Sequence, residues 1–539
     1  MKTKLARAAV LLFFAALLLV GLVTCADYGL PCDEPAEQVI LQENMHEYAC
    51  RLLGEDSSAA QWYREREIGR ISESVEKDHG QSAYYAFMPV LASHLEQPHE
   101  LTQLWKAYTW VLFMLGCAAI YGFCREMELN RFVSSIGVLL LYLCPRFFAE
   151  GHYNNKDMVL LSMVLCTLYL GVRFLKKPGF WRGALFSLAG ALAANTKIVG
   201  ALGWGLMGLA AIVLVSASRQ WNRRMTGVAA STIALFFVFY ALLTPASWGD
   251  PLGYLEYLLI NASGFTRWTG VVVFRGMVFD HDVNPLPRYY LVWMMLATLP
   301  LYVVPLAAAG QLGALWRVWK QRTKALTDPV SLTNAAVSLC WFLPLLAAVV
   351  LRPLVYNGWR HFYFVYAGVV LLAAQGVQTC LDFVKKHGGD CGMPAVFLAG
   401  LLLFFGWTAK DIAANHPYQY GYYNLLGNRN AEVDMELDYW DVSTVNAMEQ
   451  LANGKRNEEW PLVLGGSDPM SWFGVYHGYE VLNPDVRALL TITEEPNPPY
   501  LFYNTTYARI YGIEPPEGYR ELLSIESYGN TLCTVYEKQ

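Results

Sequence analysis

Four short polar clusters interrupt a strongly apolar chain, and their residue types are those used in acid–base and phosphate chemistry. They lie at residues 27–37, 145–157, 195–197 and 358–366. The first two clusters hold carboxylates, and the last two hold cations. Ionisable side chains beside apolar runs are costly to place there and often mark a functional site. The set suits a base that faces one substrate and cations that face an anionic group, and it also suits a transporter of an anionic substrate.

Two adjacent carboxylates, Asp33 and Glu34, dominate the first cluster. A carboxylate at a membrane boundary can remove a proton from an incoming hydroxyl, because partial burial raises its pKa. The same stretch also fits the start of a helix, with Asp33 as N-cap, Pro35 in the first turn and Glu37 near the positive end of the helix dipole. The two interpretations are compatible, and both stay open.

The second cluster ends in His152, Lys156 and Asp157 within one short connector. Asp157 could orient an acceptor, assist the first-loop carboxylate, or hold a metal ion with His152. One His and one Asp make an incomplete metal site. The alternative is structural, with Asn155 and Asp157 as caps of the following helix.

The other two clusters offer cations. Lys197 breaks two apolar stretches, where it either reaches the interface with its long side chain or binds a phosphate. Arg360 and His361 lie among aromatic residues. An aromatic belt accounts for the Trp and Tyr residues there, but the adjacent Arg and His favour recognition of phosphate oxygens.

The elements that must position these clusters are membrane helices. Hydrophobic residues make up 55% of the 539 residues and charged residues 16%, well below the quarter or so of a soluble domain. The net charge of −5 and the lack of long Lys/Arg runs exclude a nucleic-acid partner. The eleven cysteines show no CxxC spacing, so we predict no structural zinc site.

About eleven spans are expected, each near the 20 or so residues that cross a bilayer as helix. Residues 1–24 form either a signal peptide or a first span, and we predict a retained helix because residues 23–25 fit a cleavage site poorly. The remaining runs lie near residues 103–122, 132–148, 157–175, 183–196, 198–216, 227–246, 289–311, 331–351, 361–381 and 394–410.

Lys and Arg residues gather in alternate loops, as the positive-inside rule requires. These loops lie near residues 125–131, 173–182, 219–224, 317–324 and 385–386. We therefore predict a multi-pass protein of the cytoplasmic (plasma) membrane with its N-terminus inside. All four polar clusters and the C-terminal domain then lie outside.

The predicted fold class is an all-α polytopic membrane protein with a small C-terminal α/β domain outside the membrane. Residues 1–410 form the membrane module, which includes a first external loop at 25–102 with helices near 33–53 and 60–78. Residues 411–539 form the tail domain, with a helix near 443–453 and strands near 461–464, 500–503, 522–526 and 531–536. Cys32 and Cys50 are candidates for a disulfide.

The chain resembles the GT-C membrane glycosyltransferases, especially the family 39-like enzymes related to protein O-mannosyltransferases and aminoarabinose transferases. The resemblance rests on the Asp33-Glu34 pair and on the segments PRFFAEGHYNNKDM, NTK, GWRHFYFVY and HPYQYGYYNLLGNRNAEVDMELDYW. It implies an inverting transferase that moves a sugar from a polyprenyl-phosphate donor to a hydroxyl of a protein, lipid or cell-surface glycopolymer. No cofactor is implied, although a divalent cation would be compatible.

The resemblance also assigns roles. It implies catalytic carboxylates at Asp33, Glu34 and Asp157, donor-phosphate contacts at Lys197, Arg360 and His361, and acceptor or supporting positions at His152, Lys156 and Glu37. The base is either Asp33 or Glu34. The β-trefoil-sized insertion of the O-mannosyltransferases is missing, so the acceptor is not carried over from them. The rival functions are a multipass transporter or flippase of an anionic or lipid-linked substrate, and a non-catalytic anchor for the tail domain.

Overall fold

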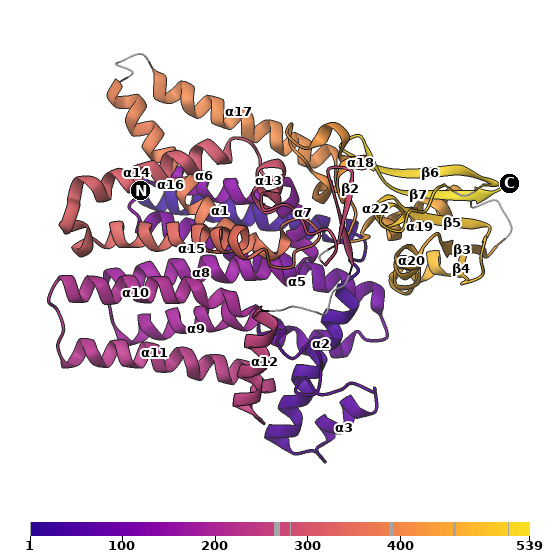
Figure 1. Ribbon diagram of the computed structural model, residues 1–539, viewed down its shortest axis with the longest axis horizontal. Coiled ribbons are helices and arrows are strands. Elements are labelled where there is room, and N and C mark those ends of the chain that lie inside the picture. Colours follow the sequence, from indigo (N-terminus) through magenta and orange to yellow (C-terminus); the bar gives the residue numbers. More distant parts are fainter. Residues whose placement is uncertain (1, 264–269, 281, 388–391, 456–459, 516) are drawn as a thin grey trace.

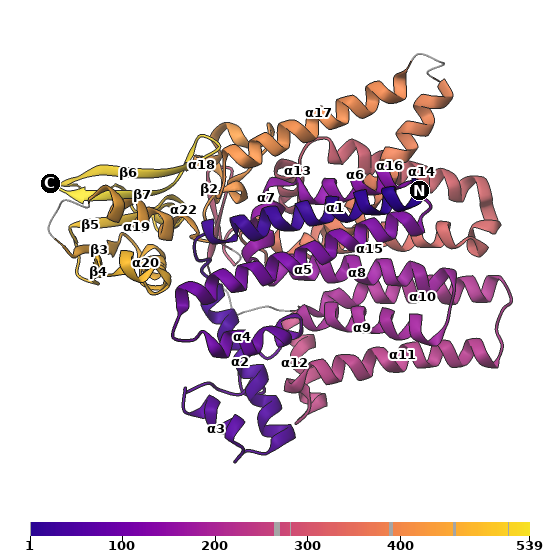
Figure 2. The ribbon, with the colours of Figure 1, turned by 180° about the vertical axis from the view of Figure 1, so that it is seen from behind.

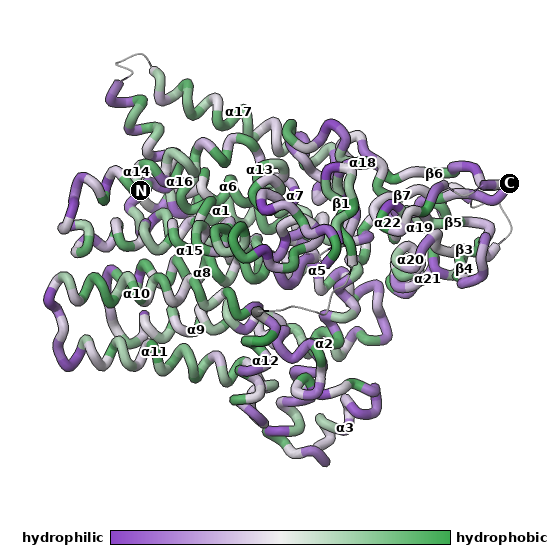
Figure 3. The backbone as a smooth tube through the Cα atoms, viewed as in Figure 1, coloured by the Kyte–Doolittle hydropathy of each residue, from purple (hydrophilic) through white to green (hydrophobic). Residues whose placement is uncertain are grey.

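A helical bundle with a small α/β domain at one end makes up the computed structural model (Figures 1 and 2). The structure describes residues 2–263, 270–280, 282–387, 392–455, 460–515 and 517–539. The bundle helices are mostly hydrophobic, whereas the tail domain and the segment around α2 and α3 carry many hydrophilic residues (Figure 3). The predicted class, an all-α integral membrane protein with a small C-terminal α/β domain, is confirmed.

Eight described helices are long and apolar enough to cross a membrane. They are α1 (Lys2–Thr24), α5 (Pro98–Glu126), α8 (Asp157–Lys176), α10 (Ala201–Ala217) with the preceding turn η4 (Ile198–Gly200), α11 (Arg223–Leu243), α15 (Pro329–Leu351), α16 (Tyr366–His387) with η7 (Arg360–Val365), and α17 (Met393–Ala414).

Two of the predicted continuous spans are bent pairs. Helix α6 (Arg131–Tyr142) meets α7 (Pro145–Tyr153) at 73°, and α13 (Tyr290–Thr298) meets α14 (Val303–Gln321) at 113°. The breaks coincide with Pro145 and Pro300, since a proline disfavours helix at the residue before it. Counting each pair once gives up to ten spans. The 17-residue α9 (Phe180–Thr196) is at the short limit for a span and is not among these ten, so the count stays just below the predicted eleven or so.

Helix α8 lies at the centre of the bundle. It packs against α5, α9, α10 and η7, and most of its residues are buried. Its first residue is Asp157. Because the helix is fixed on all sides, the side chain at its N-terminal end is also fixed in position.

Two glycines allow α14 and α16 to touch closely. A Cβ on Gly310 would lie 1.9 Å from the Leu372 carbonyl oxygen, and one on Gly376 would lie 1.8 Å from the Leu306 oxygen. Any larger residue at either position would force the two helices apart. Small residues at such crossings are the usual means of packing helices within a membrane.

The first loop folds as α2 (Glu34–Tyr48), η2 (Ala49–Leu53), α3 (Ser58–Arg64), η3 (Ser82–Phe87) and α4 (Met88–Ser93). The helix predicted over 33–53 is confirmed, but the one over 60–78 is wrong beyond Arg64. Residues 65–79 form turns instead. The turn is held by Arg70, whose guanidinium binds the buried carboxylate of Glu47 at 2.6 Å.

The predicted disulfide between Cys32 and Cys50 is also wrong, because both thiols are free. The helix that runs through α2 into η2 separates Cys32 from Cys50, which is the second residue of η2. At 1.5 Å per residue it holds them about 25 Å apart, whereas a disulfide needs Cα atoms within about 7 Å.

The tail domain contains a five-stranded sheet in the order β4-β3-β5-β7-β6. Strand β3 (Leu462–Gly466) is parallel to β4 (Leu490–Ile492) and β5 (Tyr500–Asn504), whereas β7 (Asn530–Lys538) is antiparallel to β5 and β6 (Tyr519–Ser527). Four of these strands and helix α19 (Ser443–Gly454) match the predicted elements. The remaining tail helices are α18 (Ala431–Asp434), α20 (Pro469–Val481), α21 (Pro484–Arg487) and α22 (Thr505–Ile510).

Two further segments lie at the tail-domain end of the bundle. Helix α12 (Pro251–Ser263) and the hairpin of β1 (Val271–Phe274) and β2 (Met277–Asp280) follow α11. Residues 415–442, called the connecting segment below, join α17 to α19. Asn424 in this segment donates to the carbonyls of Leu296 and Leu299, which fixes it on the end of α13.

Candidate active site

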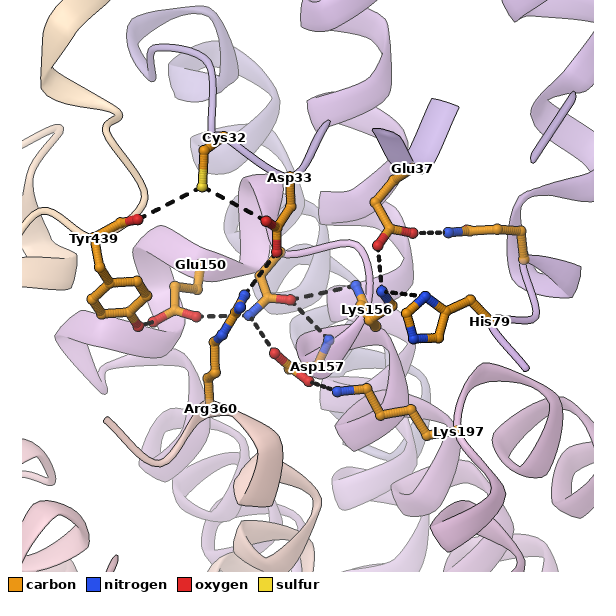
Figure 4. A network of polar contacts seen from close by, with 12 residues as sticks. Cys32, Asp33, Glu37, His79, Glu150, Lys156, Asp157, Lys197, Arg360 and Tyr439 are labelled. Carbon is orange, nitrogen blue, oxygen red and sulfur yellow. Dashed lines mark hydrogen bonds and ion pairs between the residues drawn. The ribbon is translucent and has the colours of Figure 1, made fainter. Parts of the chain in front are cut away.

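All four polar clusters meet through ion pairs at the tail-domain end of the bundle (Figure 4). Asp33 precedes α2, Lys156 and Asp157 begin α8, and Lys197 joins α9 to η4. Arg360 begins η7, the short helix before α16. Each residue lies at the end of an element, so the bundle positions its backbone while the side chain faces the junction between loops.

The carboxylate of Asp33 pairs with Arg360. Although Asp33 occupies the N-cap position of α2, its side chain makes no capping hydrogen bond. Its Oδ2 instead accepts a hydrogen bond from Nη1 of Arg360 at 2.8 Å, and its Oδ1 accepts a long one from the Cys32 thiol at 3.7 Å. The Asp33 side chain is 42% exposed. The predicted helix start, with Asp33 at the N-cap position and Pro35 in the first turn, is therefore confirmed, but the Asp33 side chain does not cap the helix.

Arg360 also keeps Asp33 ionised. Burial of the carboxyl works to raise its pKa, but the charge and hydrogen bond of Arg360, with help from Lys156, hold the pKa below its usual value. Asp33 is therefore a carboxylate at neutral pH. It combines this state with an open side, which is what a group that accepts a proton from a substrate requires.

Glu34 turns away from the cluster. Its carboxylate accepts hydrogen bonds from Thr102 of α5 and from Gln38 at 3.2 Å, and the residue is 1% exposed. Burial raises the pKa of this carboxyl to about 7, against the opposing charge of Lys106. The adjacent acids thus have different surroundings, and of the two Asp33 is the one that contacts the cationic residues.

The second ion pair joins Lys197 to Asp157 at 2.5 Å. The carboxylate is 3% exposed, and its other oxygen lies 3.5 Å from the amide of Asn154. The backbone N–H of Asp157, the first residue of α8, donates to Oδ1 of Asn154 at 2.8 Å, and the N-cap position itself is occupied by Lys156 and not by Asn155. Because its ammonium group binds the buried carboxylate of Asp157, Lys197 does not simply extend to the membrane surface.

A third pair joins Lys156 to Glu37 at 2.5 Å. Gln81 also donates to Glu37, and His79 lies 3.1 Å from the Lys156 nitrogen. These contacts tie the first loop to the start of α8. The charge of Lys156 also acts on Asp33, and the supporting role of Lys156 and Glu37 stays a prediction.

Aromatic rings surround Arg360. Its guanidinium carbon lies 4.6 Å from the ring centre of Trp440 and 5.2 Å from that of Tyr356. The ring of His361 meets Tyr356 edge to face at 4.4 Å. His361 also lies within electrostatic reach of Asp157 and Lys197. All three predicted phosphate contacts thus gather around the carboxylates.

His152 lies elsewhere. Its ring is fully buried and stacks between Trp110 at 4.1 Å and Tyr28 at 4.4 Å. Its Nδ1 contacts the Phe148 carbonyl at 2.9 Å. The structure therefore places it in an aromatic core below the loops and does not bring it to Asp157.

Several polar residues near the site escaped the sequence interpretation. Glu150 of α7 accepts hydrogen bonds from Tyr363 at 2.7 Å and Tyr439 at 3.3 Å, and Arg146 lies buried one turn before it. The i, i+4 spacing of Arg146 and Glu150 within PRFFAEGHYNNKDM is a signal that could have placed them on one helix face. Nothing in the local sequence marks Trp440.

One described group of side chains offers donors for a metal ion. Single ligand atoms of Glu76, Asp78 and His79 lie within 4.8 Å of one another. His79 also contacts Lys156, whose charge would oppose a bound cation. A site that combines His152 with Asp157 is not among the described groups.

Part of the chain matches a known protein family. Residues 99–244 match the family described as dolichyl-phosphate-mannose-protein mannosyltransferase. This part of the chain includes the second polar cluster and Lys197, and over it the resemblance seen in the sequence is confirmed. A comparison with curated proteins finds no significant match.

Two solved structures are similar to the chain. ArnT from Cupriavidus metallidurans bound to undecaprenyl phosphate has a TM-score of 0.44 and 12% identity, with 98% of each chain covered. The arabinofuranosyltransferase AftD from Mycobacteria has a TM-score of 0.44 and 14% identity, and the match covers 97% of this chain and 40% of AftD.

Proposed function

We propose that the protein is an inverting glycosyltransferase that moves a sugar from a polyprenyl-phosphate donor to an acceptor hydroxyl. The observation that carries this proposal is the pairing of a half-open, ionised Asp33 with Arg360, beside Lys197 at the same end of a membrane bundle. The partial family match to enzymes of lipid-phosphate sugars supports the donor class.

In the proposed reaction Asp33 takes the proton from the acceptor hydroxyl. The acceptor oxygen then forms a bond to the anomeric carbon from the side opposite the phosphate, which inverts the configuration. The bond between the anomeric carbon and the phosphate oxygen breaks, and its electron pair leaves with the lipid phosphate. Phosphate is a good leaving group, so cations can stabilise it in place of a general acid.

Lys197 and Arg360 are the groups suited to the departing phosphate. Arg360 presents a planar fork of N–H donors, and Lys197 presents a compact charge. In the structure each is held by a carboxylate, Arg360 by Asp33 and Lys197 by Asp157. A bound phosphate would share these cations, and the carboxylates would keep them in position before the donor arrives.

The proposed topology puts this site on the outer face of the plasma membrane, with the N-terminus inside. A donor anchored in the bilayer would then meet Asp33 at the interface, where its sugar leaves the lipid surface. The tail domain would lie on the same side.

The test is turnover by the purified protein with a set of polyprenyl-phosphate sugars, followed by mass spectrometry of the lipid phosphate and of the sugar. Equal release of lipid phosphate and free or transferred sugar is the expected result. Sugar lipid that crosses the bilayer of proteoliposomes with its phosphate bond intact would instead support the flippase alternative and contradict the proposal.

A further inference from the structure

The tail domain reaches into the candidate site through its connecting segment. The backbone N–H of Cys32 donates to the Trp440 carbonyl at 2.9 Å, and the Cys32 thiol donates to the Tyr439 carbonyl at 3.6 Å. A Cβ on Gly29 would lie 2.1 Å from the Val442 carbonyl oxygen. The stretch that leads to Asp33 is therefore bound along the connecting segment.

Trp440 also contacts Arg360, the ion-pair partner of Asp33. Trp440 is 2% exposed, and its ring centre lies 4.6 Å from the guanidinium carbon of Arg360, the residue that binds Asp33 at 2.8 Å. A desolvated guanidinium beside an indole ring is held by the negative face of the ring. Trp440 thus contacts Arg360 through its ring and Cys32, the residue before Asp33, through its backbone carbonyl.

The tail domain in turn fixes this segment. The hydroxyl of Thr506 accepts hydrogen bonds from the backbone N–H groups of Leu437 and Asp438 at 3.0 and 3.1 Å. Tyr507 donates to the Tyr439 carbonyl at 2.5 Å. Both residues lie on α22, directly after the central strand β5. Folding of the tail sheet therefore determines where Trp440 lies.

We infer that Trp440 is a positioning residue that holds Arg360 against Asp33, so that the tail domain completes the active site. The inference rests on the proposed function. The competing interpretation is that Trp440 only fills a core, since its ring also lies 5.8 Å from that of Tyr153. The two interpretations differ in whether the effect of changing Trp440 depends on Arg360.

A double-mutant cycle tests this dependence. The variants are Trp440→Leu, Trp440→Phe, Arg360→Gln and the corresponding doubles, with kcat and KM measured for transfer from a polyprenyl-phosphate sugar. Trp440→Leu should lower kcat/KM by roughly 3- to 30-fold, the range of a buried cation–aromatic contact, and Trp440→Phe should restore most of it. Trp440→Leu should have almost no further effect when Arg360 is already Gln.

Equal losses from Trp440→Leu in both Arg360 backgrounds would overturn the inference, as would failure of Trp440→Phe to rescue. Trp472→Leu, the same change in the same domain on α20, is the matched control and should leave kcat/KM unchanged. If Trp440→Leu does not fold, Trp440→Met supplies the same comparison.

The inference can be separated from the proposed function by measuring unfolding midpoints. If the wild-type protein transfers no sugar, the proposed function fails, but the same cycle can be read from thermal unfolding. With Arg360 present, the double variant Trp440→Leu/Asp33→Asn should shift the unfolding midpoint by less than the sum of the two single shifts. With Arg360→Gln, the two shifts should simply add, and this pair of results would support the positioning contact. Additive shifts in both backgrounds would overturn it.

Discussion

The two ends of α2 each hold a carboxylate beside an arginine, yet the two environments differ. Glu47, in the last turn, is fully buried and accepts hydrogen bonds from Arg51, from two nitrogens of Arg70 and from Ser72. Asp33, before the first turn, accepts one arginine hydrogen bond and one long thiol contact, and it is 42% exposed.

The difference distinguishes a carboxylate that stabilises the fold from one that a substrate can reach. Burial works to raise the pKa of Glu47, but its hydrogen bonds, led by those from Arg70, lower it to about 2. Arg360 similarly lowers the pKa of Asp33. A depressed pKa is therefore common to both acids. The distinguishing feature is the unfilled side of Asp33, where a substrate hydroxyl can approach.

The largest expected effect is on activity at Asp33. Asp33→Asn should lower kcat by about 10²- to 10⁴-fold, the usual contribution of a general base. Because the half-exposed Asp33 makes no capping hydrogen bond and only one ion pair, the unfolding midpoint should fall less than in Glu47→Gln. Turnover and thermal unfolding of the same preparation check both parts. If the unfolding midpoint of the variant fell in proportion to its lost activity, Asp33 would be, like Glu47, a residue that stabilises the fold.

The second expected effect concerns the pair formed by Lys197 and Asp157. Lys197→Gln should lower kcat by about 10²-fold, since one preorganised group that stabilises the departing charge is lost. Lys197→Arg keeps the charge and should retain more activity than Lys197→Gln. Steady-state rates of the two variants decide the matter. Equal rates for Gln and Arg would show that the charge does not act on the leaving phosphate.

A third prediction addresses stability at Glu47. Glu47→Gln should cost about 3 kcal/mol, because breaking a buried ion pair leaves its partners poorly satisfied. Activity per folded molecule should stay close to that of the wild type. Thermal unfolding in detergent, with turnover normalised to folded protein, provides the measurement. A variant with normal stability and a large loss of kcat would assign Glu47 to the site.

The pH dependence of the Glu47 contribution has a definite sign. A carboxyl with a lowered folded pKa stabilises the protein above its unfolded pKa and loses that contribution as the pH falls. The wild type should therefore lose stability as the pH decreases from the ordinary glutamate range toward about 2. The difference in unfolding midpoint between wild type and Glu47→Gln should shrink over the same interval.

The smallest effect is expected at Glu34. Burial raises its pKa to about 7, so the folded protein holds a proton that the unfolded chain releases. Stability should then fall as the pH rises from the ordinary glutamate pKa through about 7, and Glu34→Gln should remove this slope. Unfolding midpoints at pH 5 and pH 8 check the sign. An unchanged slope in the variant would contradict the assignment.

Much of this site could be predicted from the local sequence. The clusters that hold Asp33, Asp157, Lys197 and Arg360 stand out because charged side chains are rare beside apolar spans, and alternate loop charges place them at one end. Their pairing did not follow from sequence, since Asp33 and Arg360 are 327 residues apart. The choice between Asp33 and Glu34 depended on the direction of each side chain at the start of α2.

Other features depended on tertiary context. The bends at Pro145 and Pro300 are an exception, because the two prolines are a local signal for them although the hydropathy of each run is continuous. The turns after Arg64 replaced a predicted helix because Arg70 binds Glu47 across the loop. The contact of Trp440 with Arg360 required the tail sheet to fold, and no local pattern in the connecting segment indicates it.

The most direct test of the account is the release of lipid phosphate from a polyprenyl-phosphate sugar by three proteins: wild type, Asp33→Asn and Glu34→Gln. All three are measured at saturating donor and at one pH, with folding checked for each. The account predicts release by the wild type and by Glu34→Gln, and almost none by Asp33→Asn. Full release by Asp33→Asn together with loss in Glu34→Gln would contradict it.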